Sequence, residues 1–317
     1  MALNVIRFQI QGVPQWGVIR NGQITPVPGD FPTTGAFLAA HTVETLTSLQ
    51  GNPISEDSVE LLSPVTENQQ FLCQGANYRQ HMIESGMNPD DKHFNMIFTK
   101  AQSCISPANC DVIRPRRVEF LDYEIELGLV LKKNITAACT VRDDNLHECV
   151  AGLVIVNDYS ARDIQIPEMQ FYKGKSFRTF GPVGPYLCLL AREEMSKLYD
   201  MNLTLSVNGE VRQRDTTRNL VNRPPETITE LSGVQDMFIG DLIATGTPSG
   251  CALSVPSPTR QKIAALLPQA AKWKMFMKIQ AQRPHYLKPG DRVEARIVSA
   301  DGSIDLGVQR NRIVGGA

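Results

Sequence analysis

The 317-residue sequence lacks several patterns that define large classes of proteins. It contains no basic run, and 32 Lys and Arg residues against 33 Asp and Glu residues leave a formal net charge of −1. Because binding to nucleic acid or to an anionic membrane needs an excess of positive charge, we expect neither partner. The longest apolar run, Cys149 to Val156, has eight residues, whereas a membrane-spanning helix needs roughly twenty.

Common cofactor motifs are absent as well. No two of the seven cysteines form a C-x-x-C pair, and H-E-x-x-H and G-x-G-x-x-G do not occur, which leaves zinc and dinucleotides without support. Gly174-Lys175-Ser176 resembles the end of a phosphate-binding loop, but Met169 stands where that loop needs its first glycine. An odd number of unpaired cysteines and an amino terminus without a long apolar core predict a cytoplasmic protein.

Among the secondary-structure patterns in the sequence, strand patterns are the most frequent, so we expect an α+β, β-rich fold. Residues 1–65 are predicted to form a small N-terminal α/β domain, with a strand over 3–10, a hairpin at Asn21-Gly22 and a helix over 36–49. Residues 66–317 are predicted to form a second, larger domain, in which short strands outnumber helices. The helices expected there cover 78–85, 161–172, 226–238 and 260–282.

The most informative segment runs from Phe120 to Leu131 and reads FLDYEIELGLVL. A strand has a side-chain period of two, so Glu124 and Glu126 share one face, which continues as Gly128 and Val130. An E-x-E pair on a sheet commonly faces solvent, and that alternative stays open. The apolar continuation favours burial, and two buried carboxylates need a positive charge between them.

A third carboxylate, Asp158, ends the next apolar strand at Asn157-Asp158. With Glu124 and Glu126 it forms an all-oxygen set that has no Cys or His in ligand spacing. Such a set suits Mg²⁺, with Mn²⁺ also possible. The alternative for Asp158 is an N-cap of the helix that follows.

Polar side chains in other segments could carry the chemistry. His81 and Glu84 are three residues apart in a predicted helix, where a carboxylate can orient an imidazole as the general base for water. An ordinary surface pair would have the same spacing. Further donors able to bind a carboxylate or an enolate are Lys175, Arg162, Gln165 and Thr247, although each could equally be structural.

Seven motifs together resemble the fumarylacetoacetate hydrolase (FAH) superfamily over about residues 70–252 and 287–315. They are NYRQHMIESG, LDYEIELGLVL, NDYSARDIQ, YKGKSFRTFGPVGPY, LIATGTPSG, LKPGDRVEARI and LGVQRNRIV. The resemblance implies an FAH-type mixed β-roll or barrel, usually homodimeric, with its site at one open end. It also implies Mg²⁺ on Glu124, Glu126 and Asp158, a water-activating dyad of His81 and Glu84, and substrate contacts from Lys175, Arg162, Gln165 and Thr247.

We therefore expect a Mg²⁺-dependent hydrolase that cleaves a C–C bond in a β-diketo acid. Its substrate would be an acylpyruvate from aromatic catabolism, such as fumarylpyruvate, maleylpyruvate or acetylpyruvate. The alternatives are a 2-oxo acid lyase of the same superfamily, acting as an oxaloacetate decarboxylase or a 2-oxo-enoate hydratase or isomerase, and a non-catalytic metal-stabilised binding protein. Residues 253–286 are an insertion relative to small family members, which could cover the site or extend a dimer contact.

Overall fold

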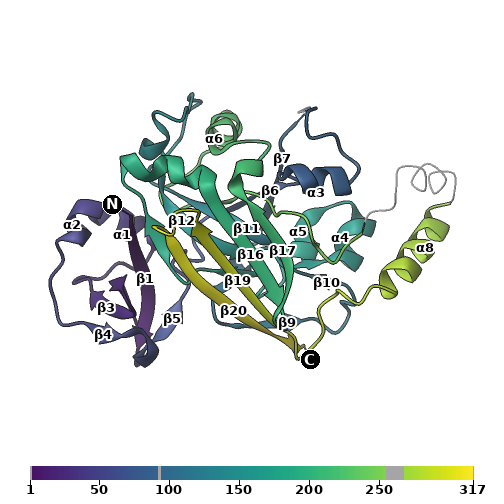
Figure 1. Cartoon of the computed structure of the whole chain (residues 1–317), viewed down its shortest axis with the longest axis horizontal. Helices are drawn as coiled ribbons and strands as arrows, with labels where there is room; N and C mark the ends of the chain where they lie inside the picture. Colours follow the sequence, from purple (N-terminus) through teal and green to yellow (C-terminus); the bar gives the residue numbers. More distant parts are fainter. Residues whose placement is uncertain (1, 92–93, 255–267, 317) are drawn as a thin grey trace.

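The computed structural model describes residues 2–91, 94–254 and 268–316. It confirms the α+β, strand-rich class, with a large and a small layer of sheet and helices gathered at their edges (Figure 1). The first part of the helix predicted over 260–282 lies outside the described residues. Among the residues that are described, no helix is long and apolar enough to cross a membrane.

The predicted strand over 3–10 and the predicted hairpin at Asn21-Gly22 are present, as parts of antiparallel pairs at the N-terminus. The strands of this region are β1 (Leu3–Ile10), β2 (Val13–Arg20), β3 (Gln23–Pro26), β4 (Ile54–Ser55) and β5 (Glu60–Leu62). Asn21 and Gly22 both have positive φ, 51° and 71°, as the tight turn between β2 and β3 requires. Because β1 pairs with β15 (Leu187–Leu189), the N-terminal strands extend the large sheet of the body, and the division at residue 65 stays a prediction.

The helix predicted over 36–49 is wrong in one respect, because the structure has two helices there. They are α1 (Thr34–Ala40) and α2 (Val43–Thr47). Thr33 and Thr42 cap them, each accepting a hydrogen bond from the backbone three residues on. The extended backbone that the Thr42 cap requires ends the first helix, although the apolar spacing continues through both.

In the large sheet, strand β11 lies among strands that come from the middle of the chain. The remaining strands of this sheet are β6 (Phe71–Gly75), β7 (Met96–Lys100), β8 (Ile105–Pro107), β11 (Ile125–Leu131), β12 (Val150–Asn157), β14 (Gly181–Val183) and β18 (Leu242–Ala244). β11 lies between β12 and β18, antiparallel to both. Every residue of β11 is buried, so no part of this strand faces solvent.

A five-stranded sheet packs against the large one. Its strands are β9 (Asp111–Arg114), β16 (Met201–Val207), β17 (Glu210–Thr216), β19 (Arg292–Ser299) and β20 (Asp305–Gly315). One hydrophobic core joins Leu127 and Leu129 of β11 to Leu203 and Leu205 of β16. Across the described residues, the two sheets face each other without closing into a barrel.

Most helices of the body lie at one end of the sheets (Figure 1). They are α3 (Arg79–Glu84), α4 (Arg162–Glu168), α5 (Phe171–Lys175) and α8 (Gln269–Ala281), with α6 (Pro224–Ser232) elsewhere. Two short strands, β10 (Leu121–Asp122) and β13 (Ser160–Ala161), pair near the same end. The 3-10 helices are η1 (Glu56–Ser58), η2 (Gln102–Cys104), η3 (Leu146–Glu148), η4 (Arg192–Asp200) and η5 (Thr217–Asn219).

Candidate active site

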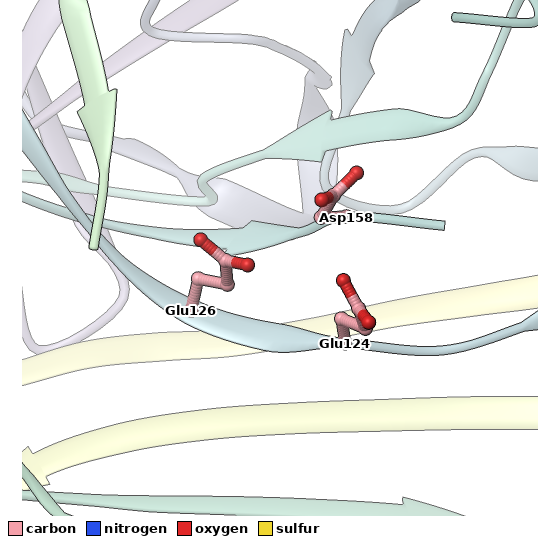
Figure 2. Close-up of side chains that lie close together, drawn as sticks. All are labelled: Glu124, Glu126 and Asp158. Atoms are coloured by element: carbon pink, nitrogen blue, oxygen red, sulfur yellow. The ribbon is translucent and has the colours of Figure 1, made fainter. Parts of the chain in front are cut away.

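The strand pairing brings Glu124, Glu126 and Asp158 together. Ile125 pairs with Asn157 in the β11–β12 register, and the Asp158 amide donates to the Glu124 carbonyl over 2.8 Å. One oxygen from each of the three carboxylates lies within 4.8 Å of the others. Figure 2 shows the two glutamates side by side on one stretch of chain, with Asp158 on the neighbouring segment.

This face is buried, which excludes the solvent-facing alternative for Glu124 and Glu126. Their exposed fractions are 5% and 1%. Gly128 continues the same face, and a Cβ atom there would lie only 2.7–2.9 Å from side-chain atoms of Val154, Val156 and Leu242. The glycine therefore lets the strands approach one another behind the carboxylates.

Asp158 binds lysine ammonium groups and does not cap a helix. The N-cap of α4 is Ala161, which makes no side-chain cap. Lys175 Nζ donates to Glu124 Oε2 over 2.6 Å, to Ser160 Oγ over 2.9 Å and to Asp158 Oδ2. Burial works against the Lys175 charge, yet Asp158 and Glu124 raise its pKa above the ordinary value. Lys175 is therefore a fixed cation inside the cluster.

Lys100 is a second buried ammonium at the cluster. Its Nζ atom donates to Asp158 Oδ1 and, over 2.8 Å, to the carbonyl of Phe180. Lys100 ends β7, so the strand itself sets its position. Asp158 is thus held on one oxygen by Lys100 and on the other by Lys175.

Arg162 links the cluster to a further carboxylate, Asp122. Its Nε and Nη1 atoms donate to Asp122 Oδ2 at 2.9 Å and to Gln165 Oε1 at 2.8 Å, while Nη2 pairs with Glu124. Asp122 also accepts from the amides of Ala252 and Leu253, at 2.7 and 2.9 Å. Although burial opposes ionisation of Glu124, Arg162 and Lys175 hold its pKa well below the usual range.

Glu126 differs from the other carboxylates because no cation in the described chain pairs with it. Among the described residues it accepts one hydrogen bond, from the amide of Gly246 over 2.8 Å. Burial, together with the charges of Asp158 and Glu124, raises the pKa of Glu126 well above its usual value.

The buried charges of this region do not balance. The four carboxylates are Asp122, Glu124, Glu126 and Asp158, and the three cations are Lys100, Arg162 and Lys175. One negative charge is therefore uncompensated whenever all four carboxylates are ionised, and the raised pKa of Glu126 marks it as the carboxyl group that takes up a proton unless another cation binds. An uncompensated buried carboxylate is strongly unfavourable. Three converging oxygen ligands with residual negative charge fit a divalent cation of the Mg²⁺ or Mn²⁺ type.

The two residues expected to form a dyad line the same cavity as Glu124 and Glu126, which has a volume of about 550 Å³. Glu84 accepts a hydrogen bond from Gln80 Nε2 at 3.3 Å. Among the described residues, no hydrogen bond links Glu84 to His81. Burial lowers the pKa of His81, and the charges of Glu124 and Glu84 oppose this shift. His81 is therefore neutral at neutral pH, and the dyad stays a prediction.

The remaining predicted contact residues also line this cavity. Thr247 uses its hydroxyl within the fold, donating to the carbonyl of Ile125 over 3.0 Å and accepting from Gln213 over 2.9 Å. Gln165 accepts from Arg162, and among the described residues its amide nitrogen has no partner. Of these residues, Gln165 retains a donor that can face a ligand, while the substrate roles of all four stay predictions.

Several residues of the site are missing from the sequence-based set. Lys100, Asp122 and Gln213 are buried in its supporting network, and Cys251 and Arg283 line the cavity. The sequence could have indicated Asp122, because it lies two residues before Glu124 and a strand with a period of two places both side chains on one face. Lys100 and Arg283 had no local signal, since single basic residues at the end of a strand or after a helix are common.

Comparisons with known proteins agree with this site. The family model for the C-terminal domain of fumarylacetoacetate (FAA) hydrolase matches residues 70–314. An oxaloacetate tautomerase of Bacillus subtilis is 35% identical over 62% of this chain and 64% of its own length. A 2,4-didehydro-3-deoxy-L-rhamnonate hydrolase of a Sphingomonas species is 32% identical over 77% of this chain and 83% of its own length.

A solved structure has the same architecture over nearly the whole chain. It is a fumarylacetoacetate hydrolase from the psychrophilic bacterium Exiguobacterium antarcticum, with a TM-score of 0.75 and 26% identity. The match covers 99% of this chain and 100% of that one. The chain belongs to the fumarylacetoacetate hydrolase family, whose members include hydrolases and tautomerases.

Proposed function

We propose that this family member is a divalent-metal-dependent hydrolase that cleaves the C–C bond of an acylpyruvate. The observation that carries the proposal is the buried cluster of Glu124, Glu126 and Asp158, whose two glutamates line one cavity together with His81. A cation and a neutral imidazole are the two groups that hydrolysis of a β-diketo acid needs. The name of the Sphingomonas relative describes the hydrolysis of a 2,4-dioxo acid, the same class of substrate.

Glu124, Glu126 and Asp158 would hold the ion, for which we propose Mg²⁺. When bound, it supplies Lewis-acid stabilisation of the negative charge that develops on the 2-oxo acid. Lys175 already occupies the same cluster as a fixed positive charge, and Gln165 offers a free amide donor to the substrate. Lys100 and Arg162 hold Asp158 and Glu124 in place, so little reorganisation is needed during the reaction.

The proposed chemistry begins at His81. A ring nitrogen of the neutral imidazole takes a proton from water, and the water oxygen attacks the carbonyl carbon of the acyl group. The bond from that carbon to the methylene then breaks, and its electron pair leaves as the enolate of pyruvate. The proton that His81 took from water then passes to the methylene carbon, which gives pyruvate, and the acyl group leaves as a carboxylic acid.

A product assay tests this proposal. The protein is incubated with acetylpyruvate and Mg²⁺, and the products are identified by NMR. We expect acetate and pyruvate in equal amounts, loss of turnover in EDTA, and loss of turnover in His81→Asn with Mg²⁺-dependent thermal stabilisation retained. Turnover by His81→Asn at the wild-type rate would show that another group activates the water.

A second candidate is tautomerisation of oxaloacetate, a reaction of the Bacillus subtilis relative. The absence of a hydrogen bond between His81 and Glu84 among the described residues favours it, because moving a proton between carbon and oxygen needs no activated water. Incubation with oxaloacetate, followed by the change in enol absorbance, distinguishes the two reactions. Tautomerisation without cleavage of acetylpyruvate would favour this candidate, and release of carbon dioxide would instead indicate a decarboxylase.

The proposal also includes the cellular compartment in which the protein acts. The seven cysteines are free thiols, which supports a reducing compartment such as the cytoplasm. A role in aromatic catabolism and a homodimeric assembly stay predictions.

A further inference from the structure

Arg283 is the cavity's basic side chain without an acidic partner among the described residues. Arg162 and Lys175 line the same cavity, and both are paired with Glu124. Arg283 donates from Nε to the carbonyl of Ala252 over 2.7 Å, and its two terminal nitrogens have no partner in the described chain. One edge of its guanidinium is therefore free for an anionic ligand.

The position of Arg283 is fixed by the end of the insertion. Arg283 lies two residues beyond the end of α8, and its amide donates to the carbonyl of Gln280, in the last turn of that helix, over 2.9 Å. Gln280 is buried, donates to the carbonyl of Ser254 over 3.0 Å and accepts from Tyr286 over 2.7 Å. These hydrogen bonds tie Gln280 to Ser254 and Arg283 to Ala252, and so hold the guanidinium at the cavity wall.

We propose that Arg283 recognises a second, terminal carboxylate on the acyl side of the substrate, so that the preferred substrates are dicarboxylic acylpyruvates. The proposal rests on the proposed function, which places the 2-oxo acid end at Glu124, Glu126, Asp158 and Lys175. A planar guanidinium with one free edge matches a carboxylate with two parallel hydrogen bonds. The insertion is then a specificity element, because it brings this cation to a cavity whose other cations are already paired.

A matched pair of unreactive ligands tests the assignment. 2-Oxoadipate and 2-oxohexanoate have the same number of carbons and differ in the terminal carboxylate, and neither is a β-diketo acid that the enzyme could hydrolyse. Their dissociation constants are measured by calorimetry with Mg²⁺ present. We expect the wild type to prefer 2-oxoadipate by between about 10- and 100-fold, the range of a charge-assisted hydrogen-bond pair.

Variants of the full-length chain test whether Arg283 causes the preference for 2-oxoadipate. Arg283→Ala should reduce the ratio of the two dissociation constants to near one, and Arg283→Lys should restore part of it. The control is Lys278→Ala, at an exposed position on α8, which should keep the wild-type ratio. If Arg283→Ala does not fold, Arg283→Gln removes the charge while keeping a donor for the Ala252 carbonyl.

The outcomes separate this proposal from the proposed function. A wild-type ratio near one, or a ratio that Arg283→Ala or Arg283→Gln leaves unchanged, would overturn the assignment. If the ratio behaves as expected but no acylpyruvate is cleaved, recognition of the terminal carboxylate stands and the hydrolase assignment fails. Cleavage of acetylpyruvate and of a dicarboxylic acylpyruvate with equal efficiency by the wild type would also contradict Arg283 as a specificity residue.

Discussion

The Nζ atom of Lys175 lies 2.6 Å from Oε2 of Glu124, inside the cluster that we propose holds the divalent cation. The same ammonium reaches Asp158 and Ser160. Lys175 is therefore both part of the charge balance of the folded protein and a fixed positive charge at the reacting end of the substrate.

Replacing Lys175 should affect activity and stability together. We expect Lys175→Met to lower turnover by at least about 100-fold, because a fixed charge that stabilises the enolate is lost. The variant should also unfold more easily, by about 3 kcal/mol in denaturant titrations, because Glu124 and Asp158 lose a buried partner. Lys173→Met is the control, since Lys173 forms an exposed pair with Glu168 and should change neither quantity appreciably. Full turnover by Lys175→Met would exclude its catalytic role.

Glu126→Gln should have opposite effects with and without metal. In EDTA the variant should be more stable than the wild type, by about 1 kcal/mol or more. The buried Glu126 carboxyl must either carry an unpaired charge or take up a proton on folding, which an amide need not do, and the amide oxygen can still accept from Gly246. With Mg²⁺ the wild type should gain thermal stability and the variant should gain little. Differential scanning fluorimetry at several Mg²⁺ concentrations measures both effects. An equal Mg²⁺ response in the two proteins would remove Glu126 from the ligand set.

Asp122 should stabilise the folded protein by holding Arg162 and residues 252–253 in place, although it is not a proposed metal ligand. Asp122→Asn weakens the pair with Arg162 and leaves fewer acceptors for the amides of Ala252 and Leu253. We expect the free energy of unfolding to fall by about 2 kcal/mol or more. The matched control is Asp111→Asn, whose partner Arg312 is exposed, and its stability should be nearly unchanged. Equal stability of both variants would contradict the supporting role of Asp122.

The pH dependence of turnover should report His81. Burial lowers its pKa below 6.5, so the neutral base persists to more acidic pH and activity should fall only below that value. Because the Glu84 charge opposes this shift, Glu84→Gln should move the acidic limb of kcat/KM to still lower pH. Profiles of the wild type, Glu84→Gln and the exposed control Glu148→Gln measure the shift. A limb that moves to higher pH in Glu84→Gln would show that another group titrates.

The sequence predicted the cluster of buried carboxylates better than the pairing of His81 with Glu84. Glu124 and Glu126 could be paired from the period of a strand, and the apolar residues Gly128 and Val130 indicated that their face is buried. Helical spacing placed His81 and Glu84 within reach of each other, but spacing does not fix rotamers, and Glu84 bonds to Gln80 instead. Lys100, which pairs with Asp158 across 58 positions of the chain, lay beyond any local pattern.

The order of residues along the chain was enough to determine the strand-rich class, the hairpin at Asn21-Gly22 and the three carboxylates, because backbone periodicity and turn chemistry act over a few residues. Tertiary structure alone decided which cations pair with those carboxylates and which cation of the cavity, Arg283, has no acidic partner in the described part of the chain. Charge compensation depends on distance in space, and the partners of a buried charge come from strands and helices that are far apart in the chain.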